Sequence, residues 1–454
     1  MSGVRACCRS AFASACVLLA APALAHAQRP GTSLSATERA LVKSVDAHNA
    51  AALALLIELV DINSGTMNFA GVRKVADVLA AHLDSLGFKT RWVDGAPFHR
   101  AGHLVAEHPG AGPKLLLIGH LDTVFEPDNP FQKFQRLDDS TAKGPGVIDM
   151  KGGDVIIVAA LHALKEARAL DRMNITIVFD GDEEESGTPL ELSRATLREA
   201  AKGAAAALGF EDGSGDPATA MTARRGAGSW ALTVTGTPSH SGQIFTPAVG
   251  AGAIFEASRV LNEFYTKLGH EQYLTFNPGV AVGGTAVKLD STGTVGTAAG
   301  KDNVVAEHMR VTGDLRTISP EQFERAEKTM KEIVAASLPG THSEITFETG
   351  YPPMAPTQGN RTLLAIYDKA SRDVGSGGVV AVDPSKAGAA DISFVANLVP
   401  MSIDALGLSG HDDHTDKETA DLRTLPMKTK RTAVFLHRLS TGALTTMPTP
   451  SVTP

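Results

Sequence analysis

Hydrophobic and polar residues follow two distinct patterns along the first half of the chain. Apolar residues recur at helical spacing over residues 33–62, 71–87 and 150–170. Continuous apolar runs, which are typical of strands buried on both faces of a sheet, occupy residues 114–122, 174–180 and 205–211. Strands that alternate with helices predict an α/β domain, with a mostly parallel sheet flanked by helices.

The pattern changes near Arg225, where apolar and polar residues begin to alternate as in a half-exposed strand. We expect strand, helix, strand, strand, helix and strand over residues 226–236, 248–268, 272–284, 303–317, 320–338 and 344–350. This order is that of a ferredoxin-like α+β domain. The α/β domain, from residues 28–224 and 351–440, is therefore predicted to be interrupted by an inserted domain at 225–350. A last helix is expected near 426–439, and the tail 441–454 is predicted to be disordered.

The N-terminal segment has the composition of a secretory signal peptide, predicted to span residues 1–27. Arg5 and Arg9 precede an apolar stretch at 11–25, which is too short to span a membrane. Small residues at Ala25 and Ala27 favour cleavage after Ala27, with cleavage after Ala25 as the alternative. We therefore expect export to a bacterial periplasm or to the medium.

The cysteine content limits the types of metal ligand that the mature chain could offer, and the charge limits its classes of binding partner. Cys7, Cys8 and Cys16 all lie in the predicted signal peptide, so the mature chain would contain neither disulfides nor thiolate ligands. A zinc site would have to use His, Asp and Glu. The formal net charge is −8 without a long basic run, which argues against nucleic acid or an anionic membrane as a partner.

Candidate metal ligands follow the predicted strands, where sites form in open α/β sheets. They are His120 and Asp122, the acidic run at 182–185 and Glu211, together with Asp149 just before a helix. Carboxylates that converge there would repel one another and would need cations. Imidazoles and carboxylates suit Zn²⁺, Mn²⁺ or Co²⁺. A pair of ions would need a bridging carboxylate and a second histidine, for which His411 and His414 are candidates.

Several stretches resemble motifs of the M20 family of di-zinc metallopeptidases, and within it the glutamate carboxypeptidase-like exopeptidases. They lie in family order between about residues 40 and 440 and read "GHLDTV", "GPGVIDMKGG", "DGDEEESG", "GFEDGSG", "GTPSHSG", "DNVVAEHMRVTGDLR" and "HTDKETADL". The resemblance implies a catalytic α/β domain interrupted by a lid and dimerisation domain, in agreement with the boundaries drawn from the pattern. Some relatives form homodimers through this domain, and others are monomers.

The resemblance also implies a metal-ligand set for two Zn²⁺ ions, with Mn²⁺ or Co²⁺ as alternatives. His120 and Glu211 would bind one metal, Glu184 and His414 would bind the other, and Asp149 would bridge them. His411 is the alternative to His414, since the sequence "GHDDH" departs from the family's glycines before the histidine.

Three consecutive glutamates stand where the family has two. Alignment on the strand assigns Glu183 as the general base and Glu184 as the ligand, whereas alignment on the following glycine assigns Glu184 and Glu185. We favour the first register, because strand geometry fixes side-chain direction while the loop tolerates an insertion. Asp122 would orient the His120 ring through its other nitrogen.

Three further residues are assigned by resemblance to the lid domain. His240 would stabilise the oxyanion of the tetrahedral intermediate, from the partner subunit in some members. Asn303 and Arg316 would bind the free α-carboxylate of the substrate. An exposed histidine and an ion-paired arginine are the simpler interpretations of His240 and Arg316.

The expected function is hydrolysis of the amide bond of a C-terminal amino acid, in small peptides or N-acyl amino acids, by a metal-activated water. An N-acyl-amino-acid deacylase of the same family is the main alternative. A family aminopeptidase or dipeptidase, and a periplasmic metal-binding protein on an inactive enzyme scaffold, are the others. Side-chain specificity does not follow from the sequence, because it varies on one fold.

Overall fold

The computed structural model describes residues 34–290 and 293–444. Its main sheet has the strand order β1-β2-β6-β3-β7-β16. These strands are Lys89–Asp94, Gly102–His108, Asn174–Asp180, Lys114–His120, Ala206–Gly209 and Ser402–Ile403. The predicted α/β fold is confirmed. The predicted signal peptide at residues 1–27 lies outside the described residues.

The sheet is mixed rather than mostly parallel, which corrects the prediction. β3 pairs in parallel with β6 and β7, and β16 pairs in parallel with β7. β1 and β2 were not predicted and pair antiparallel, β1 with β2 and β2 with β6. The short connection between them, residues 95–101, permits only an antiparallel pair, since a parallel crossover needs a dozen or more residues.

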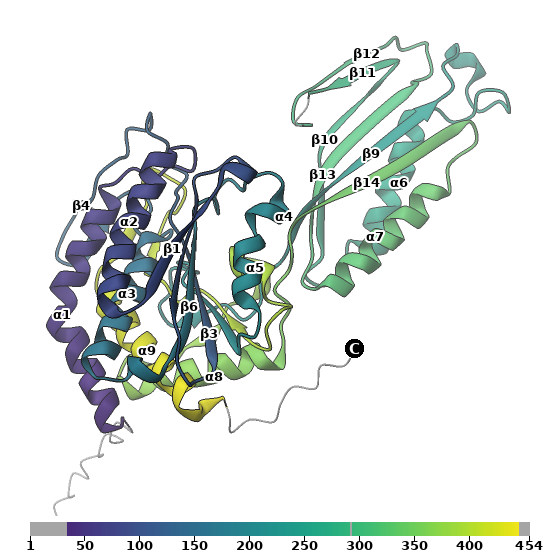
Figure 1. Cartoon of the computed structure of the whole chain (residues 1–454). Helices are drawn as coiled ribbons and strands as arrows, with labels where there is room; N and C mark the ends of the chain where they lie inside the picture. The colour runs from purple at the N-terminus through teal and green to yellow at the C-terminus, as the bar shows by residue number, and fades with distance from the viewer. Residues whose placement is uncertain (1–33, 291–292, 445–454) are drawn as a thin grey trace, which may run out of the picture. The chain divides into compact units, whose positions relative to one another are not determined.

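Both faces of the sheet are buried, as the continuous apolar runs predicted. On β3, Leu115 and Leu117 belong to one hydrophobic cluster, while Leu116 and Ile118 belong to another. The first cluster includes residues of α1 (Ala36–Val60), α2 (Phe69–Leu86), α3 (Lys151–Glu166), α8 (Gln358–Asp373) and α9 (Thr424–Arg438). The second includes Leu197 and Ala201 of α5 (Ala195–Ala201), which follows α4 (Leu190–Ser193). Figure 1 shows these elements around the sheet.

Helix α1 is, among the described residues, long and apolar enough by length and composition to cross a membrane. Leu41, Leu56 and Leu59 of this helix are fully buried in the first cluster. Ser35 caps its first turn in a reciprocal capping box with Glu38. One apolar face of α1 therefore belongs to the core of the α/β domain.

Residues 227–351 form a separate antiparallel sheet, hereafter the βαββαβ unit, with the order β10-β13-β9-β14. Its elements are β9 (Ala227–Gly236), α6 (Ala253–Leu268), β10 (Thr275–Gly284), β13 (His308–Arg316), α7 (Pro320–Ala335) and β14 (Thr341–Tyr351). β11 (Ala286–Leu289) and β12 (Gly296–Ala299) form a side hairpin. Trp230, Val260 and Met330 lie in its own apolar core. The unit is labelled on β9–β14, α6 and α7 in Figure 1.

Two predicted boundaries are wrong. Helix α6 begins at Ala253 and not near Ala248, because Gly250 and Gly252 have φ angles of 77° and 76°, outside the helical region. The tail prediction fails at its start, since Leu439–Ala443 forms a π-helical turn after α9, with a kink at Gly442. Residues 445–454 lie outside the described part.

Short strands form further small sheets beside the main sheet. β17 (Gly410–His411), β18 (Thr419–Asp421), β5 (Thr141–Lys143) and β4 (Gln135–Arg136) form one short sheet. β15 (Val380–Ala381) pairs with β8 (Thr219–Ala220) in another. Because β18 pairs with β5, the loop that carries His414 is held near the segment that carries Asp149.

Candidate metal centre

The carboxyl ends of β3, β6 and β7 lie side by side, so the residues that follow them meet. His120 ends β3, the acidic run follows β6, and Glu211 follows β7. Asp149 comes from the turn that enters α3. This is the position at which ligand sites form in α/β sheets.

The first ligand group contains His120, Asp149 and Glu211, whose donor atoms all lie within 4.8 Å of one another. The Nε2 atom of His120 is 3.0 Å from Oδ1 of Asp149 and 3.7 Å from Oε1 of Glu211. One imidazole and two carboxylates around a common point can hold a divalent cation.

The second group contains Asp149, Glu184 and His414, and it shares Asp149 with the first. The Nε2 atom of His414 is 2.9 Å from Oδ2 of Asp149 and 3.1 Å from Oε2 of Glu184. The two oxygens of Asp149 therefore face different histidines, as in a bridging carboxylate between two ions. His411, the alternative ligand, belongs to neither group in the described residues and lies beside Gly215.

Burial raises the pKa values of the glutamates at the site, whereas hydrogen bonds to His120 and His414 lower the pKa of Asp149. Burial, followed by the negative charge of Asp149, raises the pKa of Glu184 to about 7. Burial also raises the pKa of Glu211 well above its usual range. Hydrogen bonds to Asp149 and Glu184 raise the pKa of His414 to about 11. These shifts show a concentration of negative charge that a bound cation would stabilise.

Asp122 is fully buried, and it contacts both His120 and the loop that contains the acidic run at 182–185, hereafter the acidic loop. The Nδ1–H of His120 donates a hydrogen bond to the backbone carbonyl of Asp122 at 3.1 Å. This contact leaves Nε2 of His120 facing the carboxylate of Asp149. The Asp122 carboxylate accepts hydrogen bonds from the hydroxyl of Thr66 and from the backbone N–H groups of Glu183 and Glu184. Asp122 thus supports a histidine in the manner of residues behind metal ligands.

Glu418 performs a similar task for Asp149, and sequence reasoning did not assign it a role. It is fully buried, and its carboxylate accepts from the backbone N–H groups of Gly146, Ile148 and Asp149 at 2.9, 2.9 and 3.3 Å. The signal was its position four residues after His414, within the "HTDKETADL" stretch. Glu418 therefore fixes the turn that presents Asp149.

The three consecutive glutamates have different surroundings. Glu184 lies in the second ligand group, whereas Glu183 lies in neither group of the described residues. Glu185 is exposed, and its Oε1 is 2.9 Å from Nη2 of Arg100. Burial, followed by the charge of Asp391, raises the pKa of Glu183 well above its usual range. This geometry favours the register with Glu183 as base and Glu184 as ligand.

A buried charge network underlies the acidic loop and was missed in the sequence. Arg194 is 1% exposed, and its guanidinium pairs with Asp182 at 2.7 Å and with Asp391 at 2.8 Å. It also donates to the hydroxyl of Tyr351 at 2.9 Å, and that hydroxyl donates to the carbonyl of Glu183 at 2.9 Å. Tyr351 and Asp391 come from segments far from Arg194 in sequence, so no local motif marks the network.

The residues assigned to the lid lie in the βαββαβ unit. His240 and Asn303 are exposed, on adjacent segments joined by a hydrogen bond from Ser241 N to the Asn303 carbonyl. Arg316 ends β13, and its guanidinium pairs with Asp314 at 3.0 Å. In the described residues none of the three belongs to a metal-ligand group.

Comparison with known proteins finds a relative whose sequence aligns with most of this chain. Carboxypeptidase G2 from Pseudomonas sp. (strain RS-16) is 28% identical over 430 residues, which cover 93% of this chain and 97% of that protein. The alignment therefore includes both the α/β domain and the βαββαβ unit.

Solved structures share the fold. Aminopeptidase PepT from Bacillus cereus superposes with a TM-score of 0.68 at 17% identity, covering 86% of this chain and 98% of that one. A dinuclear metal-binding peptidase of the M20 family, YXEP from Bacillus subtilis, gives 0.58 at 15% identity over 87% and 99%.

The sequence profile of Peptidase family M20/M25/M40 matches residues 116–438, which include all five proposed metal ligands and Glu183. This match extends over more than half of the chain, and the expected class of hydrolase acting on peptide or other C–N bonds is confirmed. The chain belongs to peptidase family M20/M25/M40.

Proposed function

We propose that the protein is a two-metal carboxypeptidase that removes a C-terminal amino acid from small peptides or N-acyl amino acids. The observation that carries this proposal is the pair of ligand groups that share Asp149. Their imidazole and carboxylate donors suit two Zn²⁺ ions, with Mn²⁺ or Co²⁺ as alternatives. Such ions would polarise the scissile carbonyl and acidify the attacking water.

Glu183 is the proposed general base. Its backbone is fixed from two sides, by Asp122 at the N–H and by Tyr351 at the carbonyl. A carboxylate with a raised pKa accepts a proton more readily, and it can then deliver that proton to the leaving amine. Glu184 is committed to His414 and Asp149, and Glu185 to Arg100.

Residues of the βαββαβ unit are proposed to bind the substrate. His240 would donate to the oxyanion of the tetrahedral intermediate, and Asn303 and Arg316 would bind the free α-carboxylate. Both His240 and Asn303 are exposed and next to one another, which leaves them accessible to a ligand. The carboxypeptidase activity named for the Pseudomonas relative supports this assignment.

The test is a panel of substrates for the zinc-loaded protein. Each leaving amino acid is presented with a peptide acyl group and with a simple N-acyl group, with and without a free α-carboxylate. A carboxypeptidase cleaves both acyl classes and loses turnover when the carboxylate is amidated. Cleavage of N-acyl amino acids alone would instead assign a deacylase, and no turnover with two bound metals would indicate an inactive scaffold.

Export is a further part of the proposal, supported by Arg5, Arg9 and the apolar stretch at 11–25. N-terminal sequencing of protein from the periplasm or medium should then begin at Gln28, after Ala27.

We also propose a homodimer formed through the βαββαβ unit. Phe255 and Ile254 on α6 are 55% and 45% exposed, and Phe245 before the helix is 67% exposed. The rings of Phe245 and Phe255 lie 5.5 Å apart and form one exposed apolar patch. Such patches mark contact surfaces in soluble proteins.

A further inference from the structure

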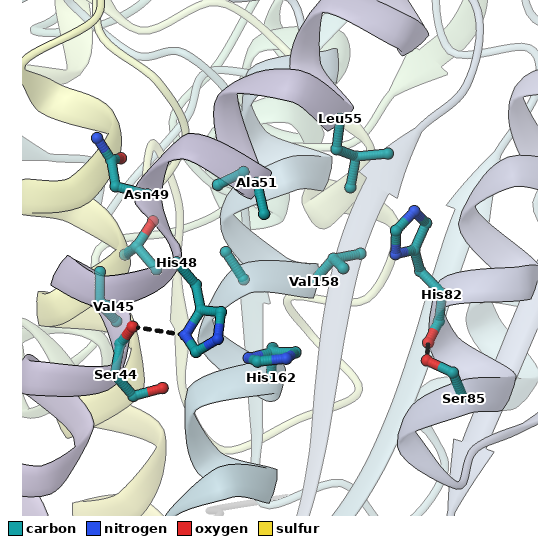
Figure 2. A pocket seen from close by; sticks show the side chains of 13 residues that line it. Ser44, Val45, His48, Asn49, Ala51, Leu55, His82, Ser85, Val158 and His162 are labelled. Carbon is teal, nitrogen blue, oxygen red and sulfur yellow. Dashed lines mark hydrogen bonds between the residues drawn. The ribbon is translucent and has the colours of Figure 1, made fainter.

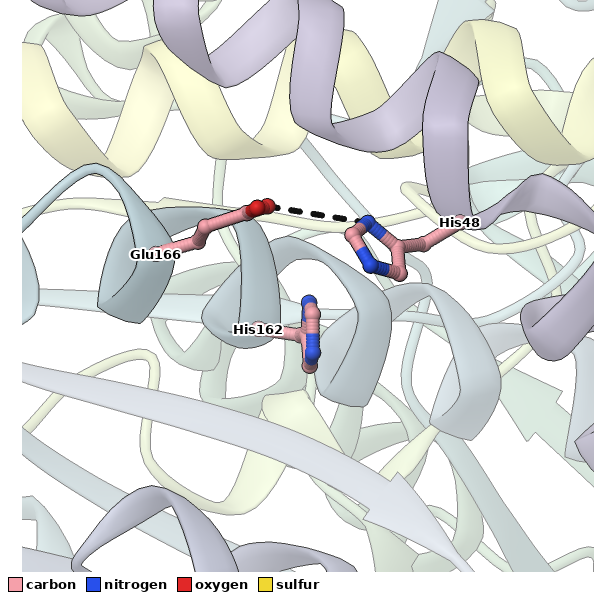
Figure 3. A group of neighbouring side chains, drawn as sticks. All are labelled: His48, His162 and Glu166. Atoms are coloured by element: carbon pink, nitrogen blue, oxygen red, sulfur yellow. Dashed lines mark ion pairs between the residues drawn. The ribbon is translucent and has the colours of Figure 1, made fainter.

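Two helices of the α/β domain carry a second kind of side-chain cluster, which shares no residue with the metal centre. His162 and Glu166 are four residues apart on α3 and therefore lie on the same face of that helix. His48 reaches them from α1, as Figure 3 shows. One donor atom from each of the three residues lies within 4.8 Å of the other two.

The three side chains lie close together. The Nδ1 atom of His48 is 3.6 Å from Oε2 of Glu166, and the rings of His48 and His162 have centroids 4.5 Å apart. Ligand atoms placed tetrahedrally at the usual zinc–nitrogen and zinc–oxygen distances lie roughly 3.4 Å apart. Side-chain rotations on the two helices would bring Nε2 of His48, the ring nitrogen that does not face Glu166, into that range.

Ser44 orients two of the three side chains. Its backbone carbonyl accepts a hydrogen bond from Nδ1 of His48 at 3.0 Å, which leaves Nε2 with a lone pair. Its hydroxyl donates to the Glu166 carboxylate. Imidazoles that bind metals are commonly held in this way, by a carbonyl on the ring nitrogen that does not ligate. Figure 2 shows the contact between Ser44 and His48.

The cluster is accessible from solvent. The side chains of His48 and Glu166 are 43% and 54% exposed, so an ion can enter from solvent. Burial, followed by the proximity of His48, lowers the pKa of His162, which favours the unprotonated imidazole. An unprotonated imidazole is the form that binds a metal.

A cavity of about 320 Å³ borders both histidines and gives room for water molecules to complete the coordination. Its wall is otherwise largely apolar, with Val45, Leu55 and Val158, and His82 faces it from α2 (Figure 2). Three protein ligands with one open position on a cavity are typical of accessible zinc sites.

We propose that His48, His162 and Glu166 form a third metal site, for Zn²⁺ or a similar divalent transition-metal ion, that links α1 to α3. Such an ion binds the folded protein, because the unfolded chain does not bring the two helices together. It therefore stabilises the fold by mass action. The site is independent of the proposed catalytic function, and either can fail without the other.

The first test counts zinc. Protein that already holds its two catalytic metals is dialysed against increasing free zinc, and bound metal is measured by atomic spectroscopy. The wild-type protein should bind one equivalent more than His48→Ala and one more than His162→Ala. His82→Ala, a histidine of the same cavity outside the cluster, is the matched control and should retain that equivalent. Equal stoichiometry in the wild-type and both cluster variants would overturn the proposal.

The second test measures stability rather than metal content, and it uses the conservative variant Glu166→Gln. With the catalytic metals in place, added zinc should raise the melting temperature of the wild-type protein and of His82→Ala. The rise should be lost in Glu166→Gln and His162→Ala, while turnover without added zinc stays at the wild-type level. A zinc-dependent rise of the same size in all four proteins would contradict a site between α1 and α3.

Discussion

Asp122 contacts residues of both ligand groups of the candidate metal centre, His120 in the first and Glu184 in the second. Its carbonyl faces Nδ1 of His120, and its carboxylate accepts the N–H groups of Glu183 and Glu184. The substitution Asp122→Asn replaces one acceptor oxygen by an N–H donor and so disrupts the loop that carries the base and a ligand. We expect metal affinity to fall by about 10–100-fold.

Competition with a chromogenic chelator measures that change. Asp77→Asn is the matched control, since Asp77 is an exposed carboxylate that pairs with Arg73 on α2. Unchanged metal affinity in Asp122→Asn would show that Asp122 does not position the ligands.

The candidate ligands could be identified in the sequence because each follows a recognisable strand or motif, and the structure brings them into two groups. The geometry also distinguishes His414 from His411, an alternative that the spacing left open. The supporting residues could not be predicted in the same way. Thr66 and Arg194 act through contacts with Asp122 and Asp391, which depend on how distant segments approach in the folded chain.

At the scale of elements, β14 ends in a residue that reaches the acidic loop. The hydroxyl of Tyr351 donates to the Glu183 carbonyl and also contacts Arg194 and Ser186. Tyr351→Phe removes these hydrogen bonds and keeps the ring. A net loss of about 0.5–1.5 kcal/mol in positioning the base corresponds to roughly a 2–12-fold lower kcat.

Steady-state kinetics with metal analysis checks this prediction. Bound metal in Tyr351→Phe should equal that of the wild-type protein, because the ligand set is intact. Tyr265→Phe, an exposed tyrosine on α6, is the control. A loss of metal, or an unchanged kcat, would argue against a role for Tyr351 in placing Glu183.

Helix α9 contains a buried lysine with a consequence for stability. Lys428 is 1% exposed, and in the described residues its ammonium donates a long hydrogen bond of 3.4 Å to the Ala405 carbonyl. Burial, followed by the charge of Arg431, lowers its pKa to about 7. From pH 7 up to its unfolded pKa, the unfolded state holds a proton that the native state has released.

The free energy of unfolding should therefore rise with pH over this window, by at most about 1.4 kcal/mol per pH unit from Lys428. Lys428→Met removes this contribution to the slope. Because the wild-type protein gains stability from Lys428 as the pH rises, the free energy of unfolding of the variant minus that of the wild-type protein should fall between about pH 8 and about pH 10. Urea denaturation of both proteins at the two pH values measures it, with Lys74→Met on the surface of α2 as control. An equal difference at both pH values would contradict the prediction.

Element prediction succeeded where burial imposes a simple pattern, as in β3 and β6, which are apolar along their length. It failed for β1, whose residues Lys89–Asp94 are mostly polar and lie at the sheet edge. Pairing with β2 stabilises such a strand, and this contact is not visible in the local sequence.

At the scale of the whole molecule, the exposed patch on α6 predicts self-association. Phe255→Asp places a charge in the centre of that patch and should convert a dimer into a monomer. Light scattering after gel filtration measures the mass, which should be twice that of one chain for the wild-type protein. Leu137→Asp is the matched control, because Leu137 is also 55% exposed but lies in the α/β domain. A monomeric wild-type protein would refute the proposed dimer.

The central claim is that two cations are held by groups sharing Asp149 and that Glu183, not its neighbours, moves the proton. The most direct measurement is metal content and turnover of an N-acyl glutamate for Glu183→Gln, Glu184→Gln and Glu185→Gln. The account predicts two metals and a kcat lower by several orders of magnitude for Glu183→Gln, weakened metal binding for Glu184→Gln, and near-normal behaviour for Glu185→Gln. Full activity of Glu183→Gln, with loss of activity but not of metal in Glu184→Gln, would contradict it.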